Sequence, residues 1–123
     1  MQFIYTDGTS GQAVMQATAP GQVLNGGPGV NVLSDAGGFG VTFLGTLAEL
    51  ANETITGFSA KDVIDVTDLN SATAIASYTG SVSDGVLGVS DGARTGGIPL
   101  SGQISGGFQV TSDQHGGTLI TLS

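Results

Sequence analysis

The chain has 123 residues, no cysteine, two cationic residues and ten carboxylates, which gives a formal net charge of −8 at pH 7. This length predicts a single domain, residues 1–123, and the missing cysteines exclude disulfides and thiolate metal sites. The acidic balance disfavours nucleic acid and anionic membranes as partners, and no apolar stretch of about eighteen residues predicts membrane insertion.

Short β-type segments alternate with glycine turns along the whole chain, in which 22 residues are glycine. The predicted strands, in chain order, are Gln2–Tyr5, Ala13–Ala17, Gln22–Leu24, Val30–Leu33, Val41–Leu44, Glu53–Phe58, Asp62–Val66, Thr73–Tyr78, Val86–Val89, Phe108–Ser112 and Thr118–Leu122. One helical turn is predicted over Thr46–Ala51, because Thr46 and Glu49 have the spacing of a capping box. This alternation of short β segments with glycine turns predicts an all-β fold, a right-handed parallel β-solenoid or β-roll, with a β-sandwich as the alternative.

The glycine-rich segment Asn25-Gly26-Gly27-Pro28-Gly29-Val30-Asn31-Val32-Leu33 resembles the nonapeptide of the repeats-in-toxin (hemolysin-type calcium-binding) family, Gly-Gly-x-Gly-x-Asp-x-U-x. In that family calcium lies between stacked turns. Here Asn31 takes the place of the aspartate, and the next glycine segment has Thr42 there. Because neutral ligands hold calcium weakly, we interpret these repeats as degenerate and mainly structural.

Three further segments, Asn52–Phe58, Asp62–Leu69 and Phe108–Ile120, are similar to those that follow such repeats in large secreted bacterial proteins and adhesins. The resemblance implies export by a type I system, which needs no N-terminal signal peptide, and a location outside the cell or on its surface. The first eleven residues contain no basic residue and no long apolar run, in agreement with this expectation.

Five oxygen-bearing side chains are the candidate calcium ligands, because a hard cation needs converging oxygens. They are Asn31, Asp35, Asp62, Asp65 and Asp68. Strand alternation would place Asp62 and Asp68 on one face and Asp65 on the other. The competing interpretation is that these acids lie at corners and on the solvent face while the neighbouring valines and isoleucines pack.

No catalytic site is predicted, and we expect the protein not to be an enzyme. His115 is the only histidine, and Asp113-Gln114-His115-Gly116-Gly117 reads as an exposed turn, which is a poor setting for a Ser-His-Asp triad. No pair of acids lies in an apolar or aromatic context typical of a hydrolase, and the chain lacks tryptophan.

Both ends of the chain are β-prone and uncharged, although free sheet edges normally carry charge or proline that prevents pairing with another copy. We therefore predict a self-assembly contact made by Phe3, Ile4, Tyr5, Leu119, Ile120 and Leu122. The alternative is that these strands complete the sheet of their own monomer. The predicted function is a secreted structural protein that polymerises into filaments, biofilm matrix or a surface layer. A calcium-stabilised adhesin or secretion module, in contact with a cell surface or polysaccharide, is the other candidate.

Overall fold

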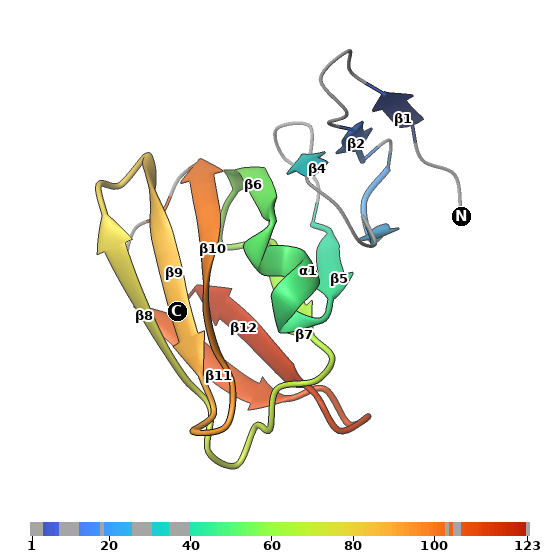
Figure 1. Ribbon diagram of the computed structural model, residues 1–123. Coiled ribbons are helices and arrows are strands. Elements are labelled where there is room, and N and C mark those ends of the chain that lie inside the picture. Colours follow the sequence, from blue (N-terminus) through green and yellow to red (C-terminus); the bar gives the residue numbers. More distant parts are fainter. Residues whose placement is uncertain are drawn as a thin grey trace.

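The computed structural model describes residues 4–7, 13–17, 19–25, 31–34, 40–102, 104 and 107–122 (Figure 1). Phe3 and Asp35 lie outside these residues. The elements of the described residues are β1 (Ile4–Asp7), β2 (Ala13–Gln16), β3 (Val23–Leu24), β4 (Asn31–Ser34), β5 (Thr42–Gly45), α1 (Leu47–Ala51), β6 (Glu53–Phe58), β7 (Val63–Val66), β8 (Ile75–Gly80), β9 (Asp84–Ser90), β10 (Thr95–Gly102), β11 (Phe108–Ser112) and β12 (Thr118–Leu122).

The strands form two mixed sheets, one of seven strands in the order β1-β2-β4-β6-β10-β9-β8 and one of five in the order β11-β12-β7-β5-β3. From β2 to β7 the chain passes alternately between them. As a result β2, β4 and β6 pair in parallel in the first sheet, and β3, β5 and β7 pair in parallel in the second.

After β7 the chain changes to antiparallel hairpins, so the predicted parallel β-solenoid is wrong as a description of the chain. Strands β8, β9 and β10 pair antiparallel in sequence order, as do β11 and β12, and β12 is antiparallel to β7. The layout is sandwich-like, which was the alternative prediction. The physical reason is turn length: Ser81 N–H to Asp84 O and Asp91 N–H to Arg94 O close two-residue loops, which join only antiparallel strands.

Strand β10 was not predicted, because Gly96, Gly97 and Pro99 read as turn residues. In the structure these two glycines let neighbouring side chains pack closely against β10. A Cβ on Gly96 would lie 3.1 Å from the Leu47 side chain, so the missing side chain makes room for the helix. Pro99 faces Val86 across the β9–β10 pair, and β10 also joins β6 in parallel.

The predicted helical turn is confirmed as α1. Thr46 is its N-cap: the Thr46 hydroxyl accepts from the Glu49 N–H at 3.2 Å, and the Glu49 carboxylate accepts from the Thr46 N–H at 3.0 Å. This reciprocal pair satisfies two backbone donors at the start of the helix. Leu47 and Leu50 are buried, so the turn also contributes to the core.

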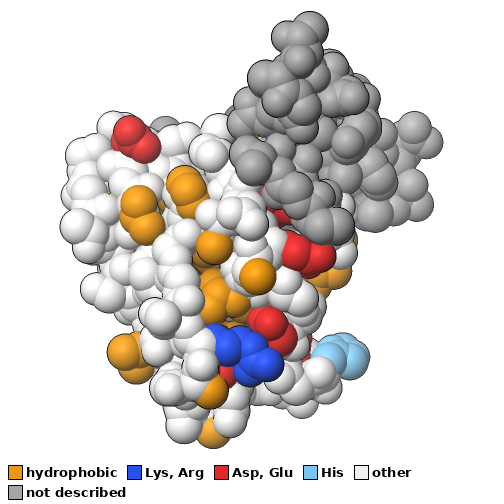
Figure 2. All heavy atoms as spheres, viewed as in Figure 1, with side chains coloured by type: hydrophobic (Ala, Val, Ile, Leu, Met, Phe, Trp, Pro, Cys, Tyr) orange, Lys and Arg blue, Asp and Glu red, His pale blue; other side chains and the backbone are white. Residues whose placement is uncertain are grey.

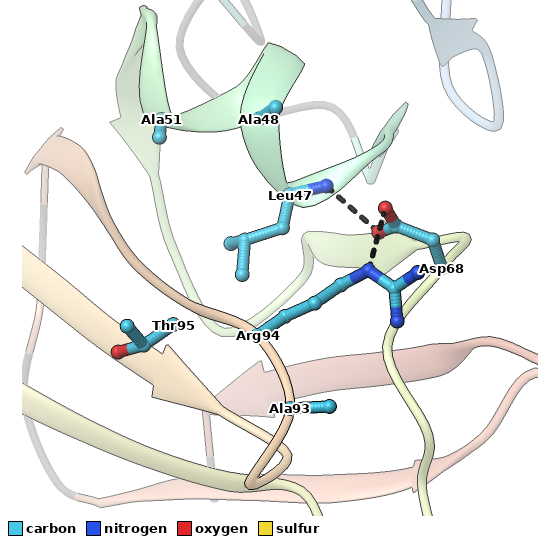
Figure 3. A pocket seen from close by; sticks show the side chains of 7 residues that line it. All are labelled: Leu47, Ala48, Ala51, Asp68, Ala93, Arg94 and Thr95. Carbon is cyan, nitrogen blue, oxygen red and sulfur yellow. Dashed lines mark hydrogen bonds and ion pairs between the residues drawn. The ribbon is translucent and has the colours of Figure 1, made fainter.

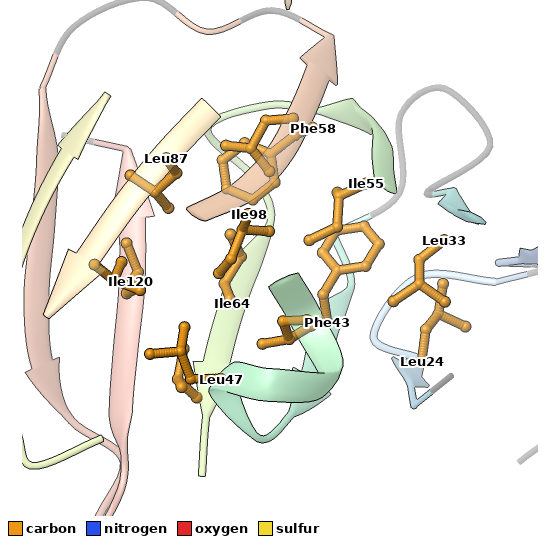
Figure 4. Close-up of a cluster of buried hydrophobic side chains, with 14 of the residues drawn as sticks. Leu24, Leu33, Phe43, Leu47, Ile55, Phe58, Ile64, Leu87, Ile98 and Ile120 are labelled. Carbon is orange, nitrogen blue, oxygen red and sulfur yellow. The ribbon is translucent and has the colours of Figure 1, made fainter. Parts of the chain in front are cut away.

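The buried side chains of both sheets form one hydrophobic cluster (Figure 4). Aromatic rings cross it from one half of the chain to the other: Phe43 and Phe58 are 6.2 Å apart, Phe58 and Phe108 are 6.0 Å apart, and Phe108 and Tyr78 are 5.9 Å apart. These centroid separations are those of favourable aromatic pairs. None of the helices among the described residues has the length and apolar character needed to cross a bilayer.

Candidate functional site

Asp62, a candidate calcium ligand, is fully buried and holds backbone together. One of its oxygens accepts from the Val41 N–H at 3.1 Å, and the other accepts from the Ser59 N–H at 3.0 Å. The residue therefore fastens the β6–β7 turn to the segment that leads into β5, the strand that pairs with β7. Two of the carboxylate's hydrogen-bonding directions are used inside the protein.

Asp68 lies at the mouth of an open pocket of about 390 Å³ between α1 and the β9–β10 hairpin (Figure 3). Its Oδ1 accepts from the Leu47 N–H at 2.9 Å, and its Oδ2 lies 3.4 Å from Arg94 Nε. The pocket is otherwise lined by Leu47, Ala48, Ala51, Ala93 and Thr95. The pocket thus has a largely apolar wall and one ion pair at its end.

Asp65 belongs to a different group, beside Asp113 and the exposed hairpin loop that carries His115. Burial, followed by the hydrogen bond and the charge of Asp113, raises the pKa of Asp65 from 3.8 to about 6, while the charge of His115 opposes this. No N–H or O–H donor of the described residues reaches the buried Oδ1 of Asp65. A hydrogen bond between two carboxyl groups can form only while one of them is protonated, which is why the bond with Asp113 raises the pKa of Asp65.

Asp113 is the acceptor that shapes this hairpin loop. Its Oδ1 accepts from the His115 N–H at 2.6 Å and the Gly117 N–H at 2.8 Å. The hydrogen bond with Asp65 contributes most to lowering the pKa of Asp113, and these backbone donors add to it. His115 Nδ1 lies 2.9 Å from the Asp113 carbonyl oxygen, so the one histidine is held by its own turn.

The three predicted calcium ligands whose side chains the structure describes, Asp62, Asp65 and Asp68, are therefore not brought together. Asp62, Asp65 and Asp68 have three different sets of partners, and Asn31 lies in β4, in the other sheet from Asp65. In the part of the chain that the structure describes, no group of three or more histidine, aspartate or glutamate side chains is arranged to hold a metal ion.

The predicted self-assembly residues that the structure describes lie in two strands, the edge strand β1 and the interior strand β12. Ile4 and Tyr5 lie in β1, at one edge of the seven-stranded sheet. Strand β12 is hydrogen-bonded to β11 on one side and β7 on the other, and its Ile120 and Leu122 are buried in the core. Both backbone sides of β12 are therefore paired within the monomer, which was the alternative weighed for this segment.

Strands β8 and β11 are edge strands, one in each sheet, and they contact each other. Neither contains a charged residue. The bond from Ser81 N–H to Asp84 O fixes the alternation along the β8–β9 hairpin, so the N–H groups of Ala76 and Tyr78 point away from β9. Among the described residues, neither of these two N–H groups has a hydrogen-bond acceptor.

Sequence reasoning did not single out β8 as an uncharged edge strand, although a signal was present. No charged residue occurs from Leu69 to Ser83. The large apolar side chains exposed among the described residues all lie in the β8–β9 hairpin: Ile75 is 67% exposed, Val82 68% and Val86 45%. An uncharged edge with exposed apolar side chains is the pattern associated with strand addition.

No family of known proteins, no curated protein and no solved structure matches this chain.

Proposed function

We propose that this protein is an exported bacterial structural protein that assembles with further copies of itself through its sheet edges into filaments, a matrix or a surface layer. The observation that carries the proposal is the pair of open, uncharged edge strands, β8 and β11, at one end of the sandwich. The part of the proposal that concerns export rests on the resemblance of residues 52–58, 62–69 and 108–120 to segments of secreted proteins.

The strand directions favour head-to-tail addition. Strand β8 runs in the same direction as β10, β6 and β2, while β1 runs opposite to β2. A second copy in the same orientation would therefore place its β1 antiparallel to β8. In the other sheet, its β3 would run parallel to β11. Both pairings are permitted, and repetition of this heterologous contact gives a filament.

The charge distribution is compatible with this contact. The net charge of −8 opposes association in general, but screening at physiological salt acts beyond about 8 Å. Close to the contact, β8 and β11 place no carboxylate in the strand, and β1 has one, Asp7, at its end. Each backbone hydrogen bond gained contributes about 0.5–1.5 kcal/mol, so several along two edges suffice for weak, cumulative assembly.

A head-to-tail contact has two different ends, and each can be blocked separately. Ala76→Pro removes an outward N–H from β8, a substitution that edge strands tolerate. Ile4→Lys puts a charge on β1. We expect wild-type filaments in electron micrographs and none from either variant. An equimolar mixture should form lengthwise pairs, because each variant retains the end that the other lacks.

Circular dichroism of both variants serves as the folding control. Filaments that persist in both folded variants would place the contact elsewhere, and wild-type protein without filaments at any concentration would refute the proposal.

The same micrographs, taken with calcium and with a chelator, test the second candidate function. That candidate is a calcium-stabilised adhesin or secretion module. It predicts a calcium-dependent rise in melting temperature without filaments.

A further inference from the structure

Asp65 lies on the outer face of the five-stranded sheet, partly buried between two leucines. Its neighbours in β7, Ile64 and Val66, are fully buried in the core, so the Asp65 side chain points the other way. Its cross-strand partners are Leu44 of β5 and Leu119 of β12, and both are partly buried. Since no donor of the described residues reaches its buried Oδ1, ionisation of Asp65 would leave that oxygen without a hydrogen bond.

The loop that joins β11 to β12 brings a second carboxyl group to Asp65. Gly117 permits this approach, because a Cβ there would overlap Asp113 Oδ2 and would lie 2.7 Å from the Val66 carbonyl oxygen at the end of β7. Asp113 Oδ1 holds the loop closed through the N–H groups of His115 and Gly117. The Asp113 carboxyl group therefore closes its own loop and, by its hydrogen bond with Asp65, fastens the loop to β7.

The backbone of this loop needs such support. Gln114 has a φ of 67°, in the left-handed region that residues other than glycine rarely adopt, and Gly116 has a φ of 86°. The ring of His115 is exposed and stands out from the surface (Figure 2), so the core does not anchor it. Strained backbone persists only where surrounding contacts hold it, and loss of the contact with β7 should let the loop open locally.

Among the described residues, the titratable groups that face Asp65 are Asp113 and His115, both in the loop. Strands β5 and β12, which flank Asp65, contain none. Asp113 raises the pKa of Asp65 and the charge of His115 lowers it, and with burial the result is a pKa of about 6. Loss of the proton replaces a hydrogen bond with repulsion between two carboxylates.

We propose that the Asp65–Asp113 pair is a pH-dependent switch: a proton on the pair holds loop 113–117 on β7, and loss of the proton releases the loop. The consequence for assembly rests on the proposed function. Asp113 directly follows β11, one of the two edge strands proposed for assembly, and its N–H donates to the Gly117 carbonyl oxygen at 3.1 Å. Release of the loop therefore frays the end of β11 and weakens assembly as pH rises from 5 to 8.

The first test observes the loop in a monomer, with a chelator present. The background is Ile4→Lys with His115→Gln, which blocks lengthwise growth and removes the other titratable group of the loop. Amide hydrogen exchange at position 115 and at Gly117 should show protection factors that fall roughly threefold or more between pH 5 and pH 8. Asp65→Asn should abolish this fall, because an amide donates to Asp113 at both pH values. The control, Asp84→Asn, removes one exposed carboxylate elsewhere and should leave the fall unchanged.

The second test measures the lowest protein concentration that gives filaments, at pH 5 and pH 8, without Ile4→Lys. A smaller net charge at pH 5 favours association in every variant, so the informative quantity is the ratio of the two concentrations in Asp65→Asn compared with Asp84→Asn. We expect a clearly smaller ratio in Asp65→Asn, because its loop stays fastened at pH 8.

Equal protection factors at pH 5 and pH 8, or a fall that persists in Asp65→Asn, would overturn the switch. A pH-dependent loop together with equal filament ratios in Asp65→Asn and Asp84→Asn would overturn its link to β11. Absence of filaments at every pH would instead refute the proposed function, and the exchange data from the monomer would still decide whether the loop responds to pH.

Discussion

The two halves of the chain build the same two sheets by different rules. From β2 to β7, alternate strands enter opposite sheets and pair in parallel, so each strand meets a partner about twenty residues away. From β8 to β12, hairpins bring sequence neighbours together. The comparison shows that one sheet can be built by two kinds of connection, crossovers between the sheets and hairpins within one sheet. The second half completes both sheets and supplies the edge strands β8 and β11.

The largest expected effect comes from removing the ring that joins the halves. Phe58 lies in β6 of the first half and its ring is 6.0 Å from Phe108 of the second. Phe58→Ala leaves a cavity in a fully buried site and should lower the free energy of unfolding by about 3–5 kcal/mol. Urea unfolding followed by circular dichroism measures it. Phe58→Leu, the matched control, should cost clearly less, and equal losses would show that the ring contacts contribute little.

A smaller effect is expected within the first half, at Asp62. Asp62→Ala leaves the Val41 and Ser59 N–H groups without this acceptor, and one unsatisfied buried donor costs about 1–3 kcal/mol. Asp68→Ala is the comparison: its pair with Arg94 is worth at most about 1 kcal/mol, and it removes the acceptor of one part-buried N–H, that of Leu47, instead of two. Urea midpoints of the two variants should therefore differ. A greater loss for Asp68→Ala would contradict the structural role assigned to Asp62.

The smallest effect concerns the carboxyl pair that joins β7 of the first half to the β11–β12 hairpin of the second. The folded-state pKa of Asp65 is about 6, above its ordinary value of 3.8, so the folded protein holds this proton more tightly than the unfolded chain does. The resulting stabilisation is complete below about pH 4 and is lost as pH rises through 6. The lowered pKa of Asp113 acts in the opposite sense, but at lower pH.

Asp65→Asn tests this link because an amide donates a hydrogen bond at every pH. Wild-type protein should have a lower urea midpoint at pH 8 than at pH 5, and Asp65→Asn should reduce that difference. Thr111→Asn, on the exposed side of β11, is a control for the added amide. An unchanged difference in Asp65→Asn would assign the pH dependence to other groups.

Local features of the sequence determined the β-rich character, the helical turn and most strand positions. Thr46 and Glu49 form their capping box within one turn, and β-branched segments such as Glu53–Phe58 read correctly because their alternation is local. Strand β10 was missed because the reasons for Gly96 and Gly97 are contacts with Leu47 in α1 and with Val86 in the paired strand β9, which the local pattern of glycines does not reveal. The same holds for the dispersal of Asp62, Asp65 and Asp68, whose partners come from distant segments.

Tertiary structure alone decided which strands became edges. Thr118–Leu122 and Ile75–Gly80 are both uncharged and β-prone, and nothing in either segment distinguishes an interior strand from an edge. The first is enclosed between β11 and β7, and the second is an edge strand in the part of the chain that the structure describes. The physical reason is that side-chain pattern specifies which face of a strand is buried, whereas the occupancy of its two backbone edges depends on where the rest of the chain has been placed.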